Sequence, residues 1–184
     1  MIAPGPTLET PRLILRPTAA EDLEGFVTLM GDPESARFIG GVQPRAMAWR
    51  GMYAVAGAWA LQGYSMFSVL EKVTGRWVGR VGLWKPEGWP VPEVGWGLVR
   101  ECWGRGYATE ASVAAMDWAF EHLGWTEIIH SIIPQNTASQ QVAQRLGSRL
   151  LGPGRLPPPY EATLIEFWGQ DRDTWRARRK AAHP

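Results

Sequence analysis

The sequence predicts a mixed α/β fold with a partly parallel sheet, and three observations lead to this prediction. Segments with a helical period of apolar residues alternate with short β-rich runs in the order β-α-α-β-β-β-α-β-α-β-β. Two β-α-β steps follow Pro92, and such steps are the usual way to join parallel strands. The length of 184 residues suits one compact domain, which we expect to span residues 1–184.

The N-terminal third predicts one strand and two helices. The strand covers Arg12–Pro17 and stops at its proline. Thr18 and Glu21 have the spacing of a capping box, in which each side chain bonds the backbone N–H of the other residue. Apolar residues at helical spacing then predict a helix that ends at Gly31 and a second helix over Arg45–Leu61.

The middle of the chain predicts strands. Tyr64–Glu71 and Arg76–Trp84 are β-rich runs on either side of Lys72–Gly75, a short turn that contains glycine, so we expect a hairpin. Pro92–Val99 is the next strand in this prediction.

The last third alternates helices and strands. A helix is expected over Thr109–Leu123, and a strand over Glu127–Ile133 ends at a proline. A short helix follows over Asn136–Leu146, with Asn136 as its N-cap and Gly147 as its stop. The remaining segments are two strands and a basic tail, over Arg149–Gly152, Glu161–Trp168 and Arg172–Lys180.

Composition excludes several classes of protein. The formal net charge is +1. This argues against a protein that binds nucleic acids or anionic membranes, because the affinity of such proteins rests on an excess of Lys and Arg. One cysteine excludes an intrachain disulfide framework and a multi-cysteine metal site. No apolar run approaches the ~20 residues that span a bilayer, and Met1–Pro11 lacks the apolar core of a signal peptide. We therefore expect a cytoplasmic protein.

One stretch, Val94–Ala111 (VGWGLVRECWGRGYATEA), has the pattern of a ligand site. A strand enters a turn with Gly104 and Gly106, and a helix begins near Thr109. Backbone N–H groups at such a helix start favour a phosphate or pyrophosphate, and glycine lets the ligand approach closely. The turn is not a Walker loop, because no Gly-Lys-Ser/Thr follows, and Thr109 replaces the third glycine of a dinucleotide fingerprint. A plain structural connector is the alternative.

The segment WGRGYATEA resembles the acetyl-CoA pyrophosphate loop of GNAT-type N-acetyltransferases, and within them the ribosomal-protein-alanine (Rim-type) branch. Three further segments resemble that branch in the family's order, namely Leu8–Glu24, Glu93–Val99 and Asn136–Gly147. There are two departures. Trp103 replaces the Gln or Arg of the superfamily pattern, as is usual in the Rim-type branch, and Leu156–Glu161 replaces a polar, glycine-containing turn beside the acceptor.

The resemblance implies a central twisted mixed sheet of about seven strands, splayed between the fourth and fifth strands and flanked by about four helices. The pantetheine arm would fill the gap and pair with the backbone of Trp96–Val99, where an N–H near Leu98 or Val99 would face the thioester oxygen. The amides of Arg105 to Thr109 would hold the pyrophosphate. The cofactor-binding residues implied are Trp96, Gly97, Leu98, Val99, Trp103, Gly104, Arg105, Gly106, Tyr107, Ala108, Thr109, Asn136 and Ser139.

The resemblance also implies catalytic roles for two residues. Ser139 would lie near the CoA sulfur and act as general acid, with a solvated first-turn serine as the alternative. Glu93 is the leading candidate for the general base, directly or through water, and a solvated strand-end glutamate is its alternative. Glu161 and Glu166 are weaker candidates. Cys102 has no neighbouring histidine in the sequence, so we expect a loop thiol and no acetyl-cysteine.

The function implied is acetyl-CoA-dependent N-acetyltransfer directly to a primary amine in a ternary complex, without a metal. The acceptor would be a protein N-terminal α-amine or a small-molecule amine, and a homodimer is an open alternative to a monomer. A second hypothesis is a GNAT-like module that binds CoA or senses a ligand without turnover.

Eleven tryptophans are the unusual feature of the composition. Trp96 and Trp103 fall in the cofactor motifs, and Trp118 lies on a helical stripe that predicts core. Four others fall in regions that border the acceptor in relatives, so an aromatic acceptor wall is a hypothesis beside ordinary packing or a dimer contact. They are Trp49 and Trp59, placed on one side of the second helix, and Trp84 and Trp89.

Overall fold

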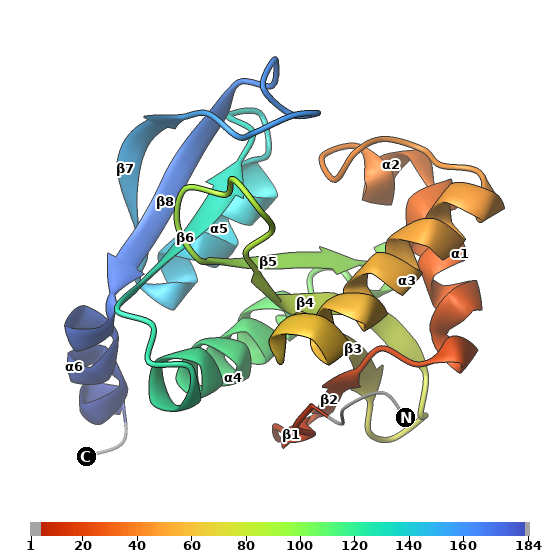
Figure 1. Ribbon diagram of the computed structural model, residues 1–184. Coiled ribbons are helices and arrows are strands. Elements are labelled where there is room, and N and C mark those ends of the chain that lie inside the picture. The colour runs from red at the N-terminus through yellow and green to blue at the C-terminus, as the bar shows by residue number, and fades with distance from the viewer. Residues whose placement is uncertain (1–4, 183–184) are drawn as a thin grey trace.

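The computed structural model describes residues 5–182, with eight strands and six α-helices in that range (Figure 1). The strands are β1 (Leu8–Glu9), β2 (Leu13–Pro17), β3 (Met66–Glu71), β4 (Trp77–Trp84), β5 (Glu93–Leu98), β6 (Glu127–Ile132), β7 (Arg149–Gly154) and β8 (Ile165–Asp171). The helices are α1 (Leu23–Gly31), α2 (Pro33–Ala36), α3 (Arg45–Gln62), α4 (Tyr107–His122), α5 (Thr137–Leu146) and α6 (Arg172–Ala182).

All eight strands form one mixed sheet in the order β1-β2-β3-β4-β5-β6-β8-β7. β5 and β6 are the parallel pair, and the other neighbours are antiparallel. The first β-α-β step, β5-α4-β6, therefore joins adjacent parallel strands as expected. In the second step β8 inserts between β6 and β7, so the two strands joined by α5 are not neighbours. The sheet contains the seven strands that were expected and one additional strand, the two-residue β1.

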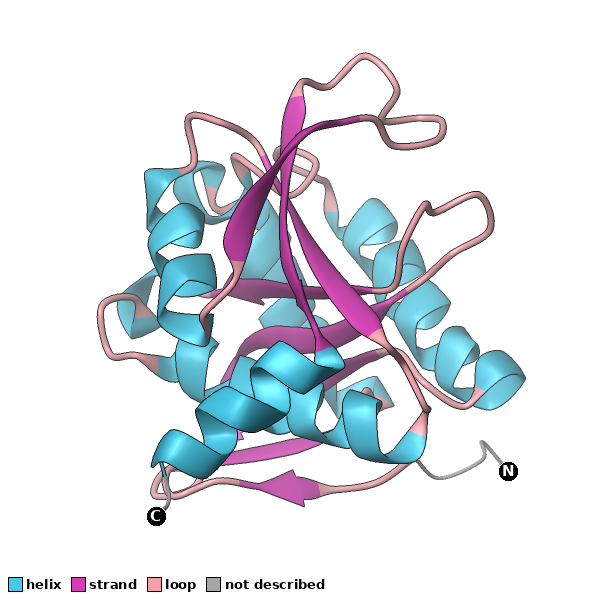
Figure 2. Ribbon diagram, turned by 90° about the vertical axis from the view of Figure 1, so that its left-hand side faces the viewer, coloured by secondary structure: helices cyan, strands magenta, loops and turns pink. Residues whose placement is uncertain are grey.

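The sheet is splayed between β5 and β6, the fourth and fifth of the expected strands. One Cα pair, Glu93 with Ile129, joins them, and the Ile129 N–H donates to the Pro92 carbonyl at 2.9 Å. Beyond this point the strands diverge, and Figure 2 shows the strands on the two sides of the gap crossing at a steep angle. The expected splay is thus present, and its open end lies at the carboxyl ends of β5 and β6.

The two faces of the sheet near β5 are covered by different elements. α4 packs against β4 and β5 and buries Ala111, Ala115 and Met116. On the opposite face, a Cβ built on Gly97 would lie 3.2 Å from Ile39 and 3.6 Å from Leu29 of α1. Because side chains alternate along a strand, Gly97 lies on the face of Leu29 and Ile39, and Trp96 lies on the opposite face, which α4 covers. Figure 1 shows α4 on one side of the sheet and α1 and α2 on the other.

The predicted capping box is wrong, although the helix behind it ends at Gly31 as expected. The carboxylate of Asp22, not the Thr18 hydroxyl, accepts a backbone N–H, that of Ala19 at 2.8 Å. Asp22 is 3% exposed and also bonds Arg16 and the Ser68 hydroxyl. A buried carboxylate needs such donors, and this requirement fixes the first turn more strongly than the capping pattern does.

The tryptophans of α3 do not share one side of the helix. Trp59 follows Trp49 by ten residues, and ten steps of about 100° make about 1000°, or roughly 280° beyond two full turns, which places the two side chains roughly 80° apart around the helix axis. Trp59 is 1% exposed and donates its indole N–H to the Met66 carbonyl, so it belongs to the core. Trp49 is 43% exposed and stacks on Tyr53 at 4.1 Å between ring centroids.

Within residues 5–182, no helix combines the length and apolar character needed to cross a membrane.

Candidate functional site

A cleft of about 750 Å³ brings most of the predicted site residues together. It lies between α2, the end of β5, the loop before α4, and α5. Val99, Arg105 and Glu93 are absent from its lining. The predicted residues that do line it are Trp96, Gly97, Leu98, Trp103, Gly104, Gly106, Tyr107, Ala108, Thr109, Asn136 and Ser139.

The glycine turn has the geometry of an anion site. Gly104 and Gly106 adopt φ values of +71° and +78°, which disfavour a side chain. α4 begins at Tyr107, two residues earlier than expected, and the Glu110 N–H is bonded to the Gly106 carbonyl at 3.0 Å. The N–H groups before Glu110 therefore have no partner within the helix, and the helix dipole adds positive charge at the same place.

The glycine turn is held by side chains from distant parts of the chain, Arg12 just before β2 and Glu71 at the end of β3. Arg12 donates to the Arg105 carbonyl at 2.9 Å, pairs with Glu110 at 2.6 Å and lies over the Tyr107 ring. The Tyr107 hydroxyl donates to Glu71, whose pKa is lowered mainly by this hydrogen bond. The turn is thus pre-formed. Sequence reasoning missed the role of Arg12 because its partners lie about ninety residues further along the chain.

Ser139 meets Trp96 at the splayed edge of β5. The Trp96 indole N–H donates to Ser139 Oγ at 3.1 Å, and the Ser139 backbone N–H donates to Asn136 Oδ1 at 3.2 Å. Asn136 is therefore the expected N-cap. Because Ser139 Oγ accepts from Trp96, its own hydroxyl proton is free to be donated into the cleft.

The backbone of β5 excludes one of the two expected oxyanion donors. The Val99 N–H donates to the Val78 carbonyl at 3.0 Å and is engaged with β4. Because bonding directions alternate along an antiparallel ladder, the N–H groups of Leu98 and Trp96 point to the β6 side, into the splay. The Trp103 indole N–H caps the Leu98 carbonyl at 2.9 Å. Of the two expected donors, only Leu98 faces the gap.

Glu93 lies where β5 and β6 begin to separate, and it is not a solvated strand-end group. Its side chain is buried and accepts from the Ser131 hydroxyl and the Trp89 indole N–H, each at 2.7 Å. Burial raises the pKa of Glu93, and these hydrogen bonds act in the opposite direction. The other acidic candidates, Glu161 and Glu166, do not line the cleft.

His130 is a buried neighbour of the cleft that sequence reasoning did not single out. Its Nδ1 is 2.6 Å from the Val94 carbonyl, its Nε2 is 3.0 Å from Ser148 Oγ, and its ring lies 4.9 Å from Trp96. Burial lowers the pKa of His130 to about 4. The His130 ring is therefore neutral at pH 7 and packs against the Trp96 ring.

The cleft residues fit a phosphorylated ligand. The Thr109 hydroxyl at the start of α4 is buried without a hydrogen-bond partner, although it belongs to a residue that lines the cleft. Arg37 and Arg145 line the same cleft and add positive charge. In the described part of the chain, no cluster of three or more His, Cys, Asp or Glu side chains has the arrangement of a metal site.

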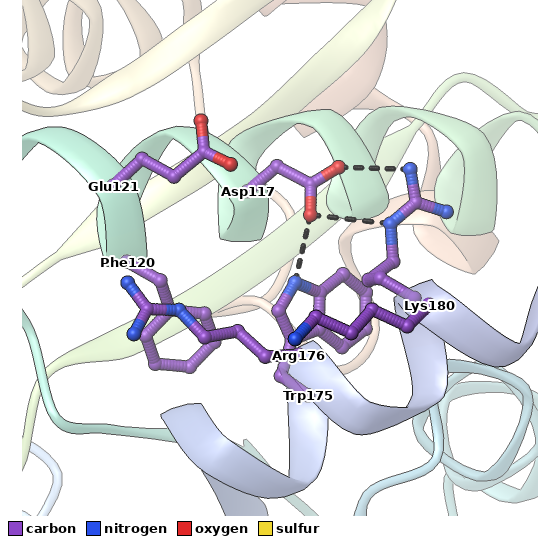
Figure 3. Close-up of a pocket in the computed structure, with 7 residues that line it drawn as sticks. Asp117, Phe120, Glu121, Trp175, Arg176 and Lys180 are labelled. Carbon is purple, nitrogen blue, oxygen red and sulfur yellow. Dashed lines mark hydrogen bonds and ion pairs between the residues drawn. The ribbon is translucent and has the colours of Figure 1, made fainter. Parts of the chain in front are cut away.

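A second hollow, of about 400 Å³, lies between α4 and α6 (Figure 3). Trp175 is 2% exposed and donates to Asp117, which also pairs with Arg179 at 3.0 Å. Asp117 lies ten residues after Tyr107, about 15 Å along α4. The basic tail is thus a docked helix at the far half of α4, away from the glycine turn.

This fold and cleft define the chain as a member of the acetyltransferase (GNAT) family. The family model described as an acetyltransferase (GNAT) domain matches residues 12–149, and the chain is an acetyltransferase. The chain is 30% identical to an uncharacterized N-acetyltransferase, p20, of Bacillus licheniformis, over 87% of this chain and 96% of that protein. It is 34% identical to the uncharacterized protein YkkB of Bacillus subtilis, over 46% of this chain and 51% of YkkB.

Solved structures share the fold. A crystal structure of an acetyltransferase from Agrobacterium tumefaciens has a TM-score of 0.79 and 32% identity, and the match covers 90% of this chain and 94% of that one. A candidate ribosomal-protein-serine acetyltransferase from Vibrio cholerae has a TM-score of 0.75 and 22% identity, over 92% and 99% of the two chains.

Proposed function

We propose that this acetyltransferase moves the acetyl group of acetyl-CoA directly to a primary amine within a ternary complex. One observation carries the proposal: a single cleft joins the pre-formed glycine turn at the start of α4 to the splayed edge of β5 and to Ser139. These are the parts that hold a pyrophosphate, align an extended arm and polarise a carbonyl.

The chain's own groups suit this ligand. The N–H groups between Arg105 and Thr109 bind the pyrophosphate, with the Thr109 hydroxyl as a further donor. The backbone of Trp96 and Leu98 binds the pantetheine arm along the splay, in place of the missing strand contacts. Acetyl-CoA supplies an activated thioester there.

The reactive end is completed by Leu98 and Ser139. The Leu98 N–H, directed into the gap, polarises the thioester carbonyl as charge builds on its oxygen. The Ser139 hydroxyl donates a proton to the departing sulfur, because Trp96 fixes its oxygen and leaves its proton free.

The amine needs little help if it is an α-amine. Deprotonation at pH 7 costs about 1 kcal/mol for an α-amine and roughly 4–5 kcal/mol for a lysine side chain. Glu93, whose burial raises its pKa, accepts the proton directly or through water in this proposal. Protein N-terminal and small-molecule amines are the acceptor classes we propose. A cytoplasmic location, a homodimer and a single domain over residues 1–184 stay predictions from the sequence.

A thiol-release assay tests this function. The protein is given acetyl-CoA with a panel of amines and short peptides, and CoA release is followed with a thiol reagent. We expect saturable release with at least one acceptor, and about tenfold or more slower turnover for Ser139→Ala at a nearly unchanged affinity for acetyl-CoA. Thr137→Ala, on the exposed first turn of the same helix, is the matched control.

Binding without release across the panel favours the alternative, a CoA-binding or sensing module. Unchanged turnover of Ser139→Ala removes this serine from the acid role.

A further inference from the structure

Arg80 lies in the centre of the sheet without a carboxylate partner. It is half-buried on β4, between Ser68 of β3 and Gly97 of β5. The register places its side chain on the face of Gly97, opposite to Trp96 and α4. Its Nη1 donates to Met66 Sδ at 3.3 Å, and no carboxylate among residues 5–182 forms an ion pair with it.

A thioether is a poor partner for a guanidinium. Sulfur accepts hydrogen bonds weakly, and a cation removed from water needs an anion or several strong acceptors to offset its desolvation. Burial accordingly lowers the pKa of Arg80. Arg16, on the same face of the sheet, shows the ordinary solution, because it is paired with the buried Asp22 at 2.8 Å. Arg80 is thus a cation whose partner is not part of the described chain.

The surroundings of Arg80 connect it to Glu93. A Cβ on Gly95 would lie 3.1 Å from Met66 Cε and 3.6 Å from Glu93 Oε1, so Met66 and Glu93 flank the same glycine. The Arg80 side chain contacts this methionine from one side. A cation and the leading base therefore share one face of the sheet, beside a position that has no side chain.

Two aromatic residues lie beside Glu93. Trp89 donates to Glu93, and the Tyr160 ring lies edge-on to Trp89 with centroids 6.1 Å apart. The proline-containing segment of Leu156–Glu161 thus brings Tyr160 against Trp89, the residue that donates to Glu93.

We propose that Arg80 binds a carboxylate of the acceptor, so that the acceptor class is an amine with one carboxylate a few bonds from its nitrogen. This inference rests on the proposed function. A planar guanidinium matches a carboxylate with two parallel hydrogen bonds. A single guanidinium carries one positive charge, which balances a carboxylate and leaves a dianionic phosphate half neutralised.

The separation of the groups fits this class. Arg80 and Gly97 are paired residues on neighbouring strands, with Cα atoms roughly 5.5 Å apart, and Gly97 adjoins the Leu98 N–H proposed for the thioester oxygen. In this proposal the acceptor spans from Arg80 on β4 to the neighbouring end of β5, with its carboxylate at one end and its amine at the other.

Paired acceptors test the inference. Free amino acids are compared with their carboxamides, and the peptide amide Ser-Glu is compared with Ser-Gln, in the thiol-release assay. We expect the carboxylate member of at least one pair to have a kcat/KM roughly 10- to 100-fold higher. Preference within the amino acids indicates a small-molecule acceptor, and preference within the peptides indicates an acidic N-terminus.

Variants separate recognition from folding. Arg80→Met removes the charge at similar length and is expected to abolish the preference, with kcat/KM for the carboxamide and affinity for acetyl-CoA unchanged. Arg80→Lys keeps the charge and should retain part of the preference. Arg50→Met is the matched control, because Arg50 also donates to a methionine sulfur, Met47, but is exposed.

The results also distinguish the inference from the function on which it rests. Equal losses for both members of a pair in Arg80→Met, or a wild-type preference for the carboxamide, would overturn the inference and leave the function intact. If no acceptor gives thiol release, the function fails, and the Tm of the protein with CoA still tests Arg80. If an added amino acid raises the Tm of the wild type but not that of Arg80→Met, the anion site is supported. If it does not raise the Tm of the wild type, the inference is overturned.

Discussion

His130 is a single residue whose environment predicts how the whole protein responds to acid. The ring is buried between Val94 and Ser148, and its pKa is about 4 in the folded chain against about 6.5 in the unfolded chain. A folded-state pKa below the unfolded value means that the unfolded chain binds more protons. The stability contributed by the neutral ring is therefore complete above pH 6.5 and is lost as the pH falls toward 4.

Denaturation with guanidinium chloride at pH 7.5 and pH 5 measures this effect. We expect the free energy of unfolding of the wild type to fall by about 2 kcal/mol more than that of His130→Asn. His122→Asn, at an exposed position, should behave like the wild type. Equal pH dependence of His130→Asn and the wild type would contradict a buried neutral ring.

At the scale of residues, the sequence motifs predicted which groups line the cleft but not what holds them. Gly104, Gly106 and Ser139 lie where the motif placed them, because turn and helix-start geometry depends on neighbours in the chain. Arg12 and His130 were missed, because each acts through contacts with distant segments. The sequence leaves both the Leu98 and the Val99 N–H as candidate oxyanion donors, because a sequence does not show which neighbouring strand an N–H faces.

At the scale of elements, segments with clear local start and stop signals were predicted well, and elements of four residues or fewer were not. Strand β4 and helix α5 match their predicted spans closely, since period and caps are local signals. The two-residue β1 and the four-residue α2 were missed, because neither is long enough to show a period. The segment that the sequence shows only as a basic tail is the docked helix α6, and its docking depends on Trp175, one buried apolar residue in a charged segment.

The docking of α6 gives a prediction for this element. Trp175→Ala removes a buried indole and its bond to Asp117, and we expect it to lower the free energy of unfolding by about 3–5 kcal/mol. Arg176→Ala and Lys180→Ala should leave the affinity for acetyl-CoA unchanged, because α6 packs on the far half of α4. Calorimetry and denaturant titration check the two parts, and weaker acetyl-CoA binding by either basic variant would place the tail at the cofactor.

At the scale of the whole molecule, the resemblance predicted the splay of the sheet, and the order of its strands was not predicted. The insertion of β8 between β6 and β7 and the single pair between β5 and β6 depend on which strands meet after long connections. No periodic pattern encodes these pairings. The cleft is their product: the sheet opens where β5 and β6 part, and the start of α4 and Ser139 of α5 lie at that opening.

The central claim is that this opening and the glycine turn bind acetyl-CoA, and isothermal titration at two temperatures tests it most directly. We expect saturable binding of one acetyl-CoA per chain by the wild type. Gly106→Val should lose it, because φ is +78° and the N–H groups around it form the proposed anion site. Gly124→Val has a similar positive φ of +66°, lies outside the cleft lining and should still bind. No binding by the folded wild type, or tight binding by Gly106→Val, would contradict the account.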